Sequence, residues 1–161
     1  MRIISKIKSA AQLVKSLGDL WLMIRIAGFI FSLPLLLRGL KLPRLMSWLT
    51  PGRPGRYSLE LREKITAYTL TLLNQDLWMF RRSCLKQGLT LYHFLPQAGQ
   101  RVQIAFGVEK SADNVLNGHC WLEIAGQVYL EGEAAREKYT LTYRYPEPSP
   151  NPLTPEFVPS R

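Results

Sequence analysis

Two patterns of apolar positions dominate the first fifty residues. Over residues 3–17 apolar side chains recur at helical spacing, with lysines on the other face. Residues 20–37 are almost wholly apolar and are interrupted only by Arg25, Ser32 and Pro34. A membrane-spanning helix needs roughly 20 consecutive apolar residues. The pattern therefore predicts helices that pack against other parts of the protein or a partner, and not a spanning segment.

The middle of the chain predicts two further helices. Residues 50–55 are rich in proline and glycine and close the N-terminal region. Ser58 is a typical N-cap, and apolar residues follow it at helical spacing as far as Leu72. A second helix is expected over residues 84–95, with Ser83 as its N-cap.

The pattern then changes from helical to alternating. Residues 102–108 alternate strictly between faces and predict a strand, and residues 109–117 predict a polar loop. Residues 118–124 and 127–131 predict a hairpin around a short glycine-containing turn. Helices followed by antiparallel strands indicate an α+β fold, with a helical N-terminal half and a small antiparallel sheet.

These patterns divide the chain into four parts. Residues 1–50 form a basic, apolar, helical N-terminal region, and residues 51–57 form a Pro/Gly linker. Residues 58–144 are expected to form the core domain. Residues 145–161 hold six of the eleven prolines and predict a disordered tail.

Charge and cysteine content exclude several classes of function. The chain carries a formal charge of +9, and residues 1–50 supply +7 of it. Two cysteines without a CxxC motif, together with two histidines, exclude a disulfide scaffold and a His/Cys-rich zinc site. The bases lack a groove-reading motif and interleaved aromatics, so nucleic acid is the weakest partner. Residues 1–50 either pack on the domain or a partner protein, or rest on an anionic membrane surface.

Cys84 is the candidate nucleophile. It opens a predicted helix, where the helix dipole and unpaired backbone N–H groups favour a thiolate and can hold a developing oxyanion. Arg81 and Arg82 precede it and act in the same direction. An isolated cysteine is more often a small core residue, so the assignment depends on a base nearby.

His119 is the candidate base. His93 lies nine positions after Cys84 on the same predicted helix, which places it on the opposite side. His119 opens a strand after a loop, where a rigid element can present an imidazole to a helix end. A lone histidine on a strand is usually structural, and only the combination with Cys84 favours catalysis.

The third member of the site depends on the register of the hairpin. A two-residue turn would pair His119 with Gly132 and point Glu131 to the wrong face. A three-residue loop with Gly126 in the left-handed region places His119 directly opposite Glu131. We expect the three-residue loop and take Glu131 as the third residue, with Glu133 on the same face as the reserve.

The sequence allows more than one role for the residues next to His119 on its strand. Trp121 and Glu123 share its face and either line the cleft or serve as sheet packing and a solvated charge. Cys120 points to the other face and is interpreted as an inert buried thiol. That geometry argues against a Cys84–Cys120 disulfide, and a reducing compartment fits.

Two segments together resemble a known family. CLKQGLTLYHFLPQAGQRVQIAFGV, residues 84–108, is followed by GHCWLEIAGQVYLE, residues 118–131. They resemble the lasso peptide biosynthesis B2 proteins, which are transglutaminase-like, papain-fold cysteine proteases. The shared pattern is a Cys-Leu that opens a helix, a strand with Gly-Val, and His-x-Trp-x-Glu before a glycine hairpin. The resemblance covers roughly residues 59–137.

The resemblance implies a leader peptidase that uses Cys84 as nucleophile and His119 as base. The family's third residue is an aspartate about twelve positions after the histidine, where this chain has Glu131. The position after the histidine is commonly alanine and is Cys120 here. Backbone N–H of Cys84 would hold the oxyanion, with Gln75 or Trp78 as candidates for a side-chain donor. No metal or other cofactor is required by these residues.

The implied partners follow from that activity. The substrate would be a ribosomally made precursor peptide, the leader would be held by a separate leader-binding protein, and a lasso cyclase would take the product. The location would be cytoplasmic, with a peripheral position at the inner face of the membrane as a variant. Another transglutaminase-type acyl transfer and a non-catalytic peptide-binding scaffold are the rival interpretations.

Overall fold

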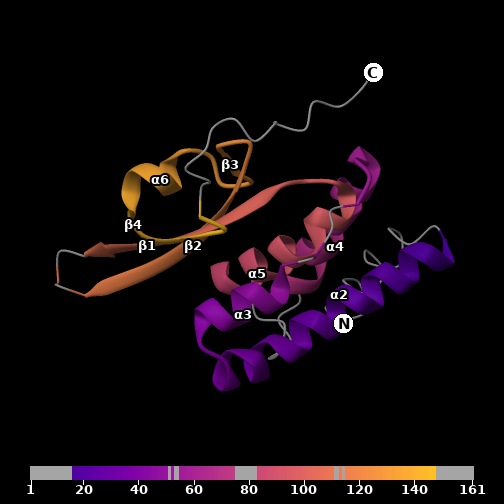
Figure 1. Cartoon of the computed structure of the whole chain (residues 1–161), viewed down its shortest axis with the longest axis horizontal. Coiled ribbons are helices and arrows are strands. Elements are labelled where there is room, and N and C mark those ends of the chain that lie inside the picture. Colours follow the sequence, from indigo (N-terminus) through magenta and orange to yellow (C-terminus); the bar gives the residue numbers. More distant parts are fainter. Residues whose placement is uncertain are drawn as a thin grey trace, which may run out of the picture.

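The described chain forms helices first and a four-stranded antiparallel sheet afterwards (Figure 1), which confirms the predicted α+β class. This computed structural model describes residues 16–50, 52, 55–74, 83–110, 113 and 115–147. The elements are α2 (Leu17–Gly39), α3 (Leu42–Leu49), α4 (Leu59–Leu73), α5 (Cys84–Phe94), the short 3₁₀ helix η2 (Leu95–Ala98), β1 (Val102–Lys110), β2 (Leu116–Ile124), β3 (Gln127–Tyr129), α6 (Ala134–Lys138) and β4 (Thr140–Tyr145).

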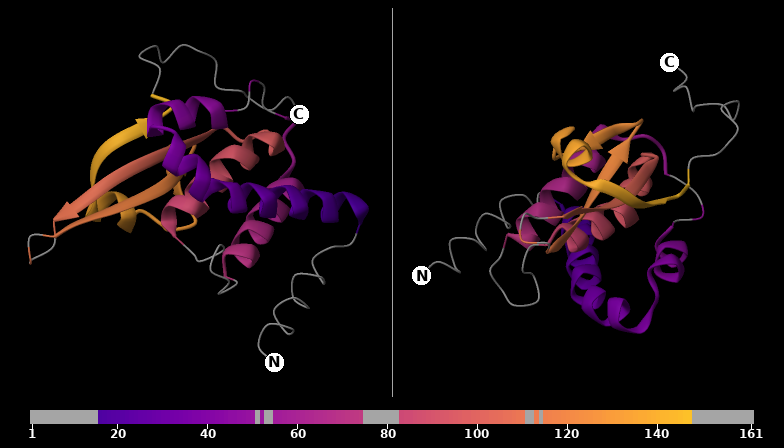
Figure 2. Two further views of the ribbon diagram at one scale, coloured as in Figure 1. Left: turned by 90° about the horizontal axis from the view of Figure 1, so that it is seen from below. Right: turned by 90° about the vertical axis from the view of Figure 1, so that its left-hand side faces the viewer.

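The elements stack in layers. Helix α5 packs on one face of β1 and β2, α4 packs beside α5, and α2 crosses both helices on the side away from the sheet (Figures 1 and 2). One large apolar core joins α2, α3, α4, α5 and the sheet. Helix α6 covers the opposite face, where Ala135 packs with Ala105 and Trp121 in a small second cluster.

The inner face of α2 belongs to the large core. Ser16 caps the helix, and its hydroxyl accepts a hydrogen bond from the Asp19 N–H at 3.1 Å. A row at helical spacing is buried: Leu22, Ile26, Ile30 and Leu33. From residue 17 onward, the N-terminal region therefore shows the packing on the domain that the first interpretation predicts.

The outer face of α2 is apolar as well. Its exposed residues include Leu17, Leu20, Trp21, Ile24, Phe31 and Leu35. By length and composition alone, α2 could cross a membrane. This is weak evidence, because the core helices of soluble proteins satisfy the same criterion. The predicted helix over residues 3–17 lies almost wholly outside the described residues, as does the tail from residue 148.

The two middle helices begin where the N-caps predict. The Ser58 hydroxyl accepts from the Leu61 N–H at 3.2 Å and opens α4. The Ser83 hydroxyl accepts from the Lys86 N–H at 3.2 Å and opens α5. After α5 and η2, the chain turns at Gly99, which has a φ of 73°. A Cβ at Gly99 would lie 2.5 Å from the Tyr57 nitrogen, so the position requires glycine.

The sheet has the order β3-β2-β1-β4. Strands β1 and β2 extend to Lys110 and Leu116, so the loop between them is shorter than the predicted 109–117. Two elements were not predicted, α6 and β4. Strand β4 has the β-branched and aromatic residues that are typical of a strand. It directly precedes the proline-rich tail, and the sequence pattern was not interpreted as a strand there.

The predicted three-residue hairpin loop is wrong. Ile124 pairs with Gln127, so Ala125 and Gly126 form a two-residue turn with φ values of 51° and 79°. Both central residues of a type I′ turn take positive φ, and the turn matches the twist of the flanking strands. That match outweighs the modest cost of placing an alanine in the left-handed region. As a result Tyr129 pairs with Leu122 and not with Trp121.

Candidate active site

Cys84 is the first residue of α5 and is half-buried. The cap at Ser83 uses the Lys86 N–H, and the Gln87 N–H donates to the Ser83 carbonyl at 3.0 Å. The first N–H groups of a helix have no partner within it, and they carry the positive end of the helix dipole. The thiol therefore lies where a negative charge on sulfur, or on a neighbouring oxygen, is favoured.

His119 lies between Cys84 and Glu131. Its Nε2 is 2.6 Å from Glu131 Oε2, and both side chains are half-buried. The imidazole also lies near enough to Cys84 for each group to shift the pKa of the other. Because Nε2 is engaged by Glu131, Nδ1 is the ring nitrogen that is available to Cys84. The ring stacks on Tyr139, with centroids 4.8 Å apart, which holds its orientation.

Glu131 reaches His119 by a route that the sequence analysis did not foresee. With the observed two-residue turn, a regular strand would place Gly132 opposite His119. The ladder instead ends at Tyr129, and Leu130 adopts a φ of 73°. This left-handed residue turns the chain and directs Glu131 back to the open edge of β2 beside His119. The predicted contact is present, although the predicted register is wrong.

The charges at the site favour an ion pair. The pKa of the Cys84 thiol is lowered to about 5, chiefly by a hydrogen bond from the Cys120 thiol and also by bonds from the Cys120 N–H and His119, against the opposing effect of burial. Burial lowers the pKa of His119, but the hydrogen bonds and charges of Glu131 and Cys84 outweigh it, so the pKa is raised. Both shifts stabilise a thiolate beside an imidazolium.

Cys120 is not remote from Cys84, and this corrects the sequence analysis. His119 and Cys120 do point to opposite faces of β2, but both lie near enough to Cys84 to lower its pKa. Helix α5 covers the Cys120 face, and a Cβ at Gly88 would lie only 3.1 Å from Cys120 Sγ. Glycine at this position lets the helix approach closely. His119 meets the same thiol at the edge of β2, because β3 stops opposite Leu122.

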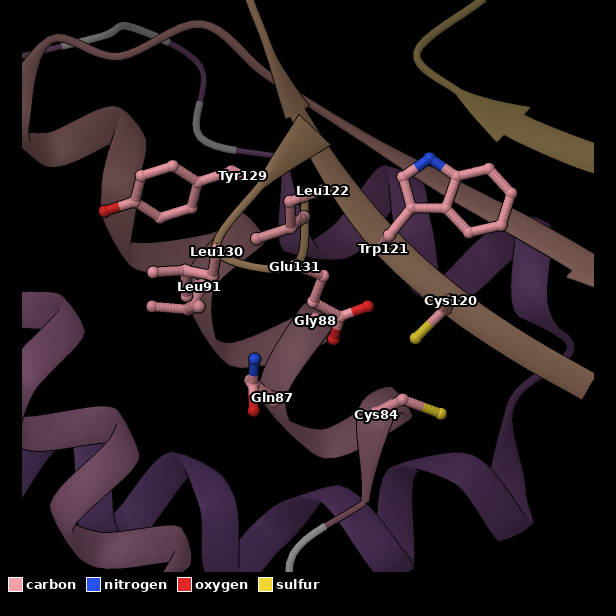
Figure 3. Close-up of a pocket in the computed structure, with 10 residues that line it drawn as sticks. All are labelled: Cys84, Gln87, Gly88, Leu91, Cys120, Trp121, Leu122, Tyr129, Leu130 and Glu131. Atoms are coloured by element: carbon pink, nitrogen blue, oxygen red, sulfur yellow. The ribbon is translucent and has the colours of Figure 1, made fainter. Parts of the chain in front are cut away.

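A small pocket adjoins Cys84 between α5 and the sheet (Figure 3). One end carries the Cys84 and Cys120 sulfurs, and Glu131 and Gln87 lie beside it. The other end is apolar and is lined by Leu91, Leu122, Tyr129 and Leu130. Cys84 thus lies at the polar end of a small pocket whose other end is apolar.

The other predicted site residues have varied positions. Trp121 lines part of this pocket but is itself buried, and its indole N–H donates to Glu123 Oε1 at 3.0 Å. Glu123 is not a solvated charge: it is 2% exposed and is paired with Arg136 at 3.0 Å and Arg144 at 3.4 Å. Burial raises the pKa of Glu123, but the bonds from Trp121 and these arginines keep it low.

The reserve candidate Glu133 and the excluded His93 contact other partners. The carboxylate of Glu133 accepts from the Val128 N–H at 3.3 Å and pairs with Arg136 at 3.2 Å, so it is not the partner of His119. His93 is a structural residue, with Nδ1 2.9 Å from the Leu49 carbonyl oxygen and its ring stacked on Phe29. Gln75, Trp78 and the two arginines before Ser83 lie outside the described residues.

The described residues include no group of three or more His, Cys, Asp or Glu side chains that could hold a metal ion. What they do include is a thiol, an imidazole and a carboxylate that lie next to one another in that order at a helix N-terminus. That order of groups is suited to acyl transfer through a thioester.

Comparison with known proteins places this geometry in a family. A family model described as the transglutaminase-like superfamily matches residues 29–144, which includes every element that positions Cys84, His119 and Glu131. The chain belongs to the transglutaminase-like superfamily. Members of the superfamily include cysteine peptidases and acyl transferases. No curated protein and no solved structure matches the chain.

Two residues of this transglutaminase-like site were not predicted from the sequence. Cys120 was set aside because alternation placed it on the far face of the strand, yet its position next to His119 was a signal that it lies close to the site. Tyr139 stacks on His119 and follows α6, an element that was not predicted. Periodicity alone does not indicate a residue placed by a short helix on the far face of a sheet.

The lowered pKa of Cys84 predicts an unusual pH profile for alkylation by iodoacetamide. The thiolate fraction decreases only as pH falls through about 5. The rate at Cys84, followed by mass spectrometry, should stay level from pH 8 to about 6 and then fall roughly tenfold per unit below pH 5. An ordinary thiol would instead lose reactivity tenfold per unit below about pH 8. A profile of that second kind would contradict the ion pair.

Proposed function

We propose that this protein is a cysteine peptidase that removes the leader from a ribosomally synthesised precursor peptide during lasso peptide maturation. The observation that carries the proposal is the spatial order Cys84, His119, Glu131 at the N-terminus of α5, in which His119 is hydrogen-bonded to Glu131 and lowers the pKa of Cys84. Membership of the transglutaminase-like superfamily supports cysteine-based acyl transfer. The resemblance of residues 84–108 and 118–131 to leader peptidases supports the substrate.

The chemistry begins with the ion pair. The Cys84 thiolate attacks the scissile carbonyl carbon, a C–S bond forms, and the carbonyl π electrons move to oxygen. The backbone N–H of Cys84 at the start of α5 stabilises that oxyanion. Glu131 holds Nε2 of His119, so that the proton on Nδ1 is directed towards the reacting atoms.

The intermediate then collapses. The C–N bond breaks as His119 gives its proton to the leaving amine, and a thioester to Cys84 remains. His119 next takes a proton from water, whose hydroxide attacks the thioester carbon. The C–S bond breaks and Cys84 leaves as a thiolate, which restores the starting state.

The partner set belongs to the same proposal. A separate leader-binding protein would present the precursor, and the lasso cyclase would receive the freed amino terminus. Exposed apolar rows are unfavourable in water, and the outer face of α2 has one along its whole length. We assign this face to the leader-binding protein. A cytoplasmic location, and a peripheral position at the membrane, remain predictions.

Product masses test the function. The precursor peptide is incubated with this chain and the leader-binding protein in the absence of cyclase, and the masses of the peptides are measured by mass spectrometry. Two fragments whose masses sum to the precursor plus one water support leader removal. An intact peptide heavier by about one mass unit would indicate deamidation, which is another acyl transfer by the same three residues. An unchanged but bound peptide would indicate the non-catalytic scaffold.

A further inference from the structure

The chain has two cysteines, and the fold brings them together. Both line the pocket beside α5, and their sulfurs lie on facing sides of it (Figure 3). The two thiols lie near enough to shift each other's pKa, and both are free. The close approach is built into the backbone, because Gly88 brings α5 against Cys120 with no side chain between them.

The two sulfurs differ in access and in charge. Cys84 is half-buried at the pocket, whereas Cys120 is 3% exposed. The bond to Cys84 and burial both raise the pKa of Cys120, so this thiol keeps its proton while Cys84 is a thiolate. A small oxidant from solution therefore meets the reactive sulfur first, and the protonated sulfur lies across the same pocket.

We propose that Cys84 and Cys120 form a reversible oxidation site for hydroperoxides, with Cys84 as the reacting thiol and Cys120 as the resolving thiol. Cys84 attacks the peroxide oxygen, the O–O bond breaks, and sulfenic acid and one alcohol or water are formed. The Cys120 sulfur then attacks the Cys84 sulfur, the S–O bond breaks, and water leaves. The two thiols give up two electrons and two protons in total, and the peroxide is reduced by two electrons.

The disulfide would protect the nucleophile. A sulfenic acid with no nearby thiol proceeds to sulfinic acid, which ordinary thiols do not reduce. Capture by Cys120 stops that reaction at a state that thiols reverse. The proposal depends on the proximity of the two cysteines, and it stands or falls independently of which acyl transfer the protein performs.

Intact mass after peroxide treatment tests this site. The reduced full-length chain is treated with hydrogen peroxide and the reaction is quenched. The intact mass is then measured by mass spectrometry before and after reduction with dithiothreitol. The wild type should lose about two mass units. Dithiothreitol should restore the original mass, and nearly all of the Cys84 thiol should again react with an alkylating reagent. A digest should contain the peptides of Cys84 and Cys120 joined within one chain.

The matched variant is Cys120→Ser, which keeps a hydrogen-bond donor beside Cys84 but cannot form the disulfide. Under the same treatment it should gain about 32 mass units at Cys84, and dithiothreitol should recover less than a tenth of the thiol. Equal accumulation of sulfinic acid in the wild type and the variant would overturn the proposal. A disulfide found only between two chains would overturn it as well.

Discussion

Cys84→Ala abolishes cleavage of the precursor peptide, with an expected loss of at least about 10⁴-fold in kcat/KM. Without the sulfur there is no atom to attack the carbonyl, and His119 alone does not form a thioester. The loss is measured by single-turnover assays with product masses. Because this residue is half-buried at a helix start, alanine removes little apolar contact, and the helical circular dichroism should be unchanged.

A second substitution separates nucleophilicity from shape. Cys84→Ser retains a side chain of similar size, but its hydroxyl does not ionise beside His119 as the thiol does. We therefore expect it to be about as inactive as the alanine variant. Cleavage by either variant at the wild-type rate would remove Cys84 from the mechanism and favour a scaffold or another nucleophile.

Glu131→Gln lowers kcat by about a hundredfold or more, and Glu133→Gln leaves it within about twofold. The first change removes the charge that lies 2.6 Å from His119 Nε2 and loosens control of the imidazole tautomer. The second carboxylate binds Val128 and Arg136 and does not touch His119. The two variants lose the same charge within three positions of each other, so the comparison isolates the contact to the imidazole.

The protonation of His119 gives a readout that a loss of stability would not mimic. Glu131 raises the pKa of His119 against the effect of burial, so Glu131→Gln should lower it and shift the loss of imidazolium to lower pH. Glu133→Gln should not move it. Two histidines in the chain make the ring signals simple to assign by NMR titration. The reverse ranking of the two variants would assign the role to Glu133.

The stretch around Cys84 was predictable because its signals are local. An N-cap serine, a cysteine at the first helical position and an apolar period of 3.6 specify a helix start with little help from the rest of the fold. The alternation that predicted β1 and β2 was local in the same way. The short elements α6 and β4 have weak periodicity, and much of their burial comes from packing on strands distant in sequence.

The hairpin shows where local reasoning stops. Glu131 was predicted as the partner of His119 on the assumption of a three-residue loop. With the observed two-residue turn, a regular strand would point Glu131 away from His119. Leu130 in the left-handed region restores the contact. A positive φ at a leucine is costly by itself, so only the surrounding structure decides that the chain turns there.

Sequence alone was enough to predict the α+β order of elements and the helix start at Cys84, and to select Cys84 and His119, because these depend on residue types and on periodicity between near neighbours. The tertiary structure decided the route of Glu131, the burial of Glu123 and the meeting of Cys84 with Cys120. Each of those depends on how closely α5 packs on β2 and where β3 ends, and such distances arise from contacts between segments far apart in the chain.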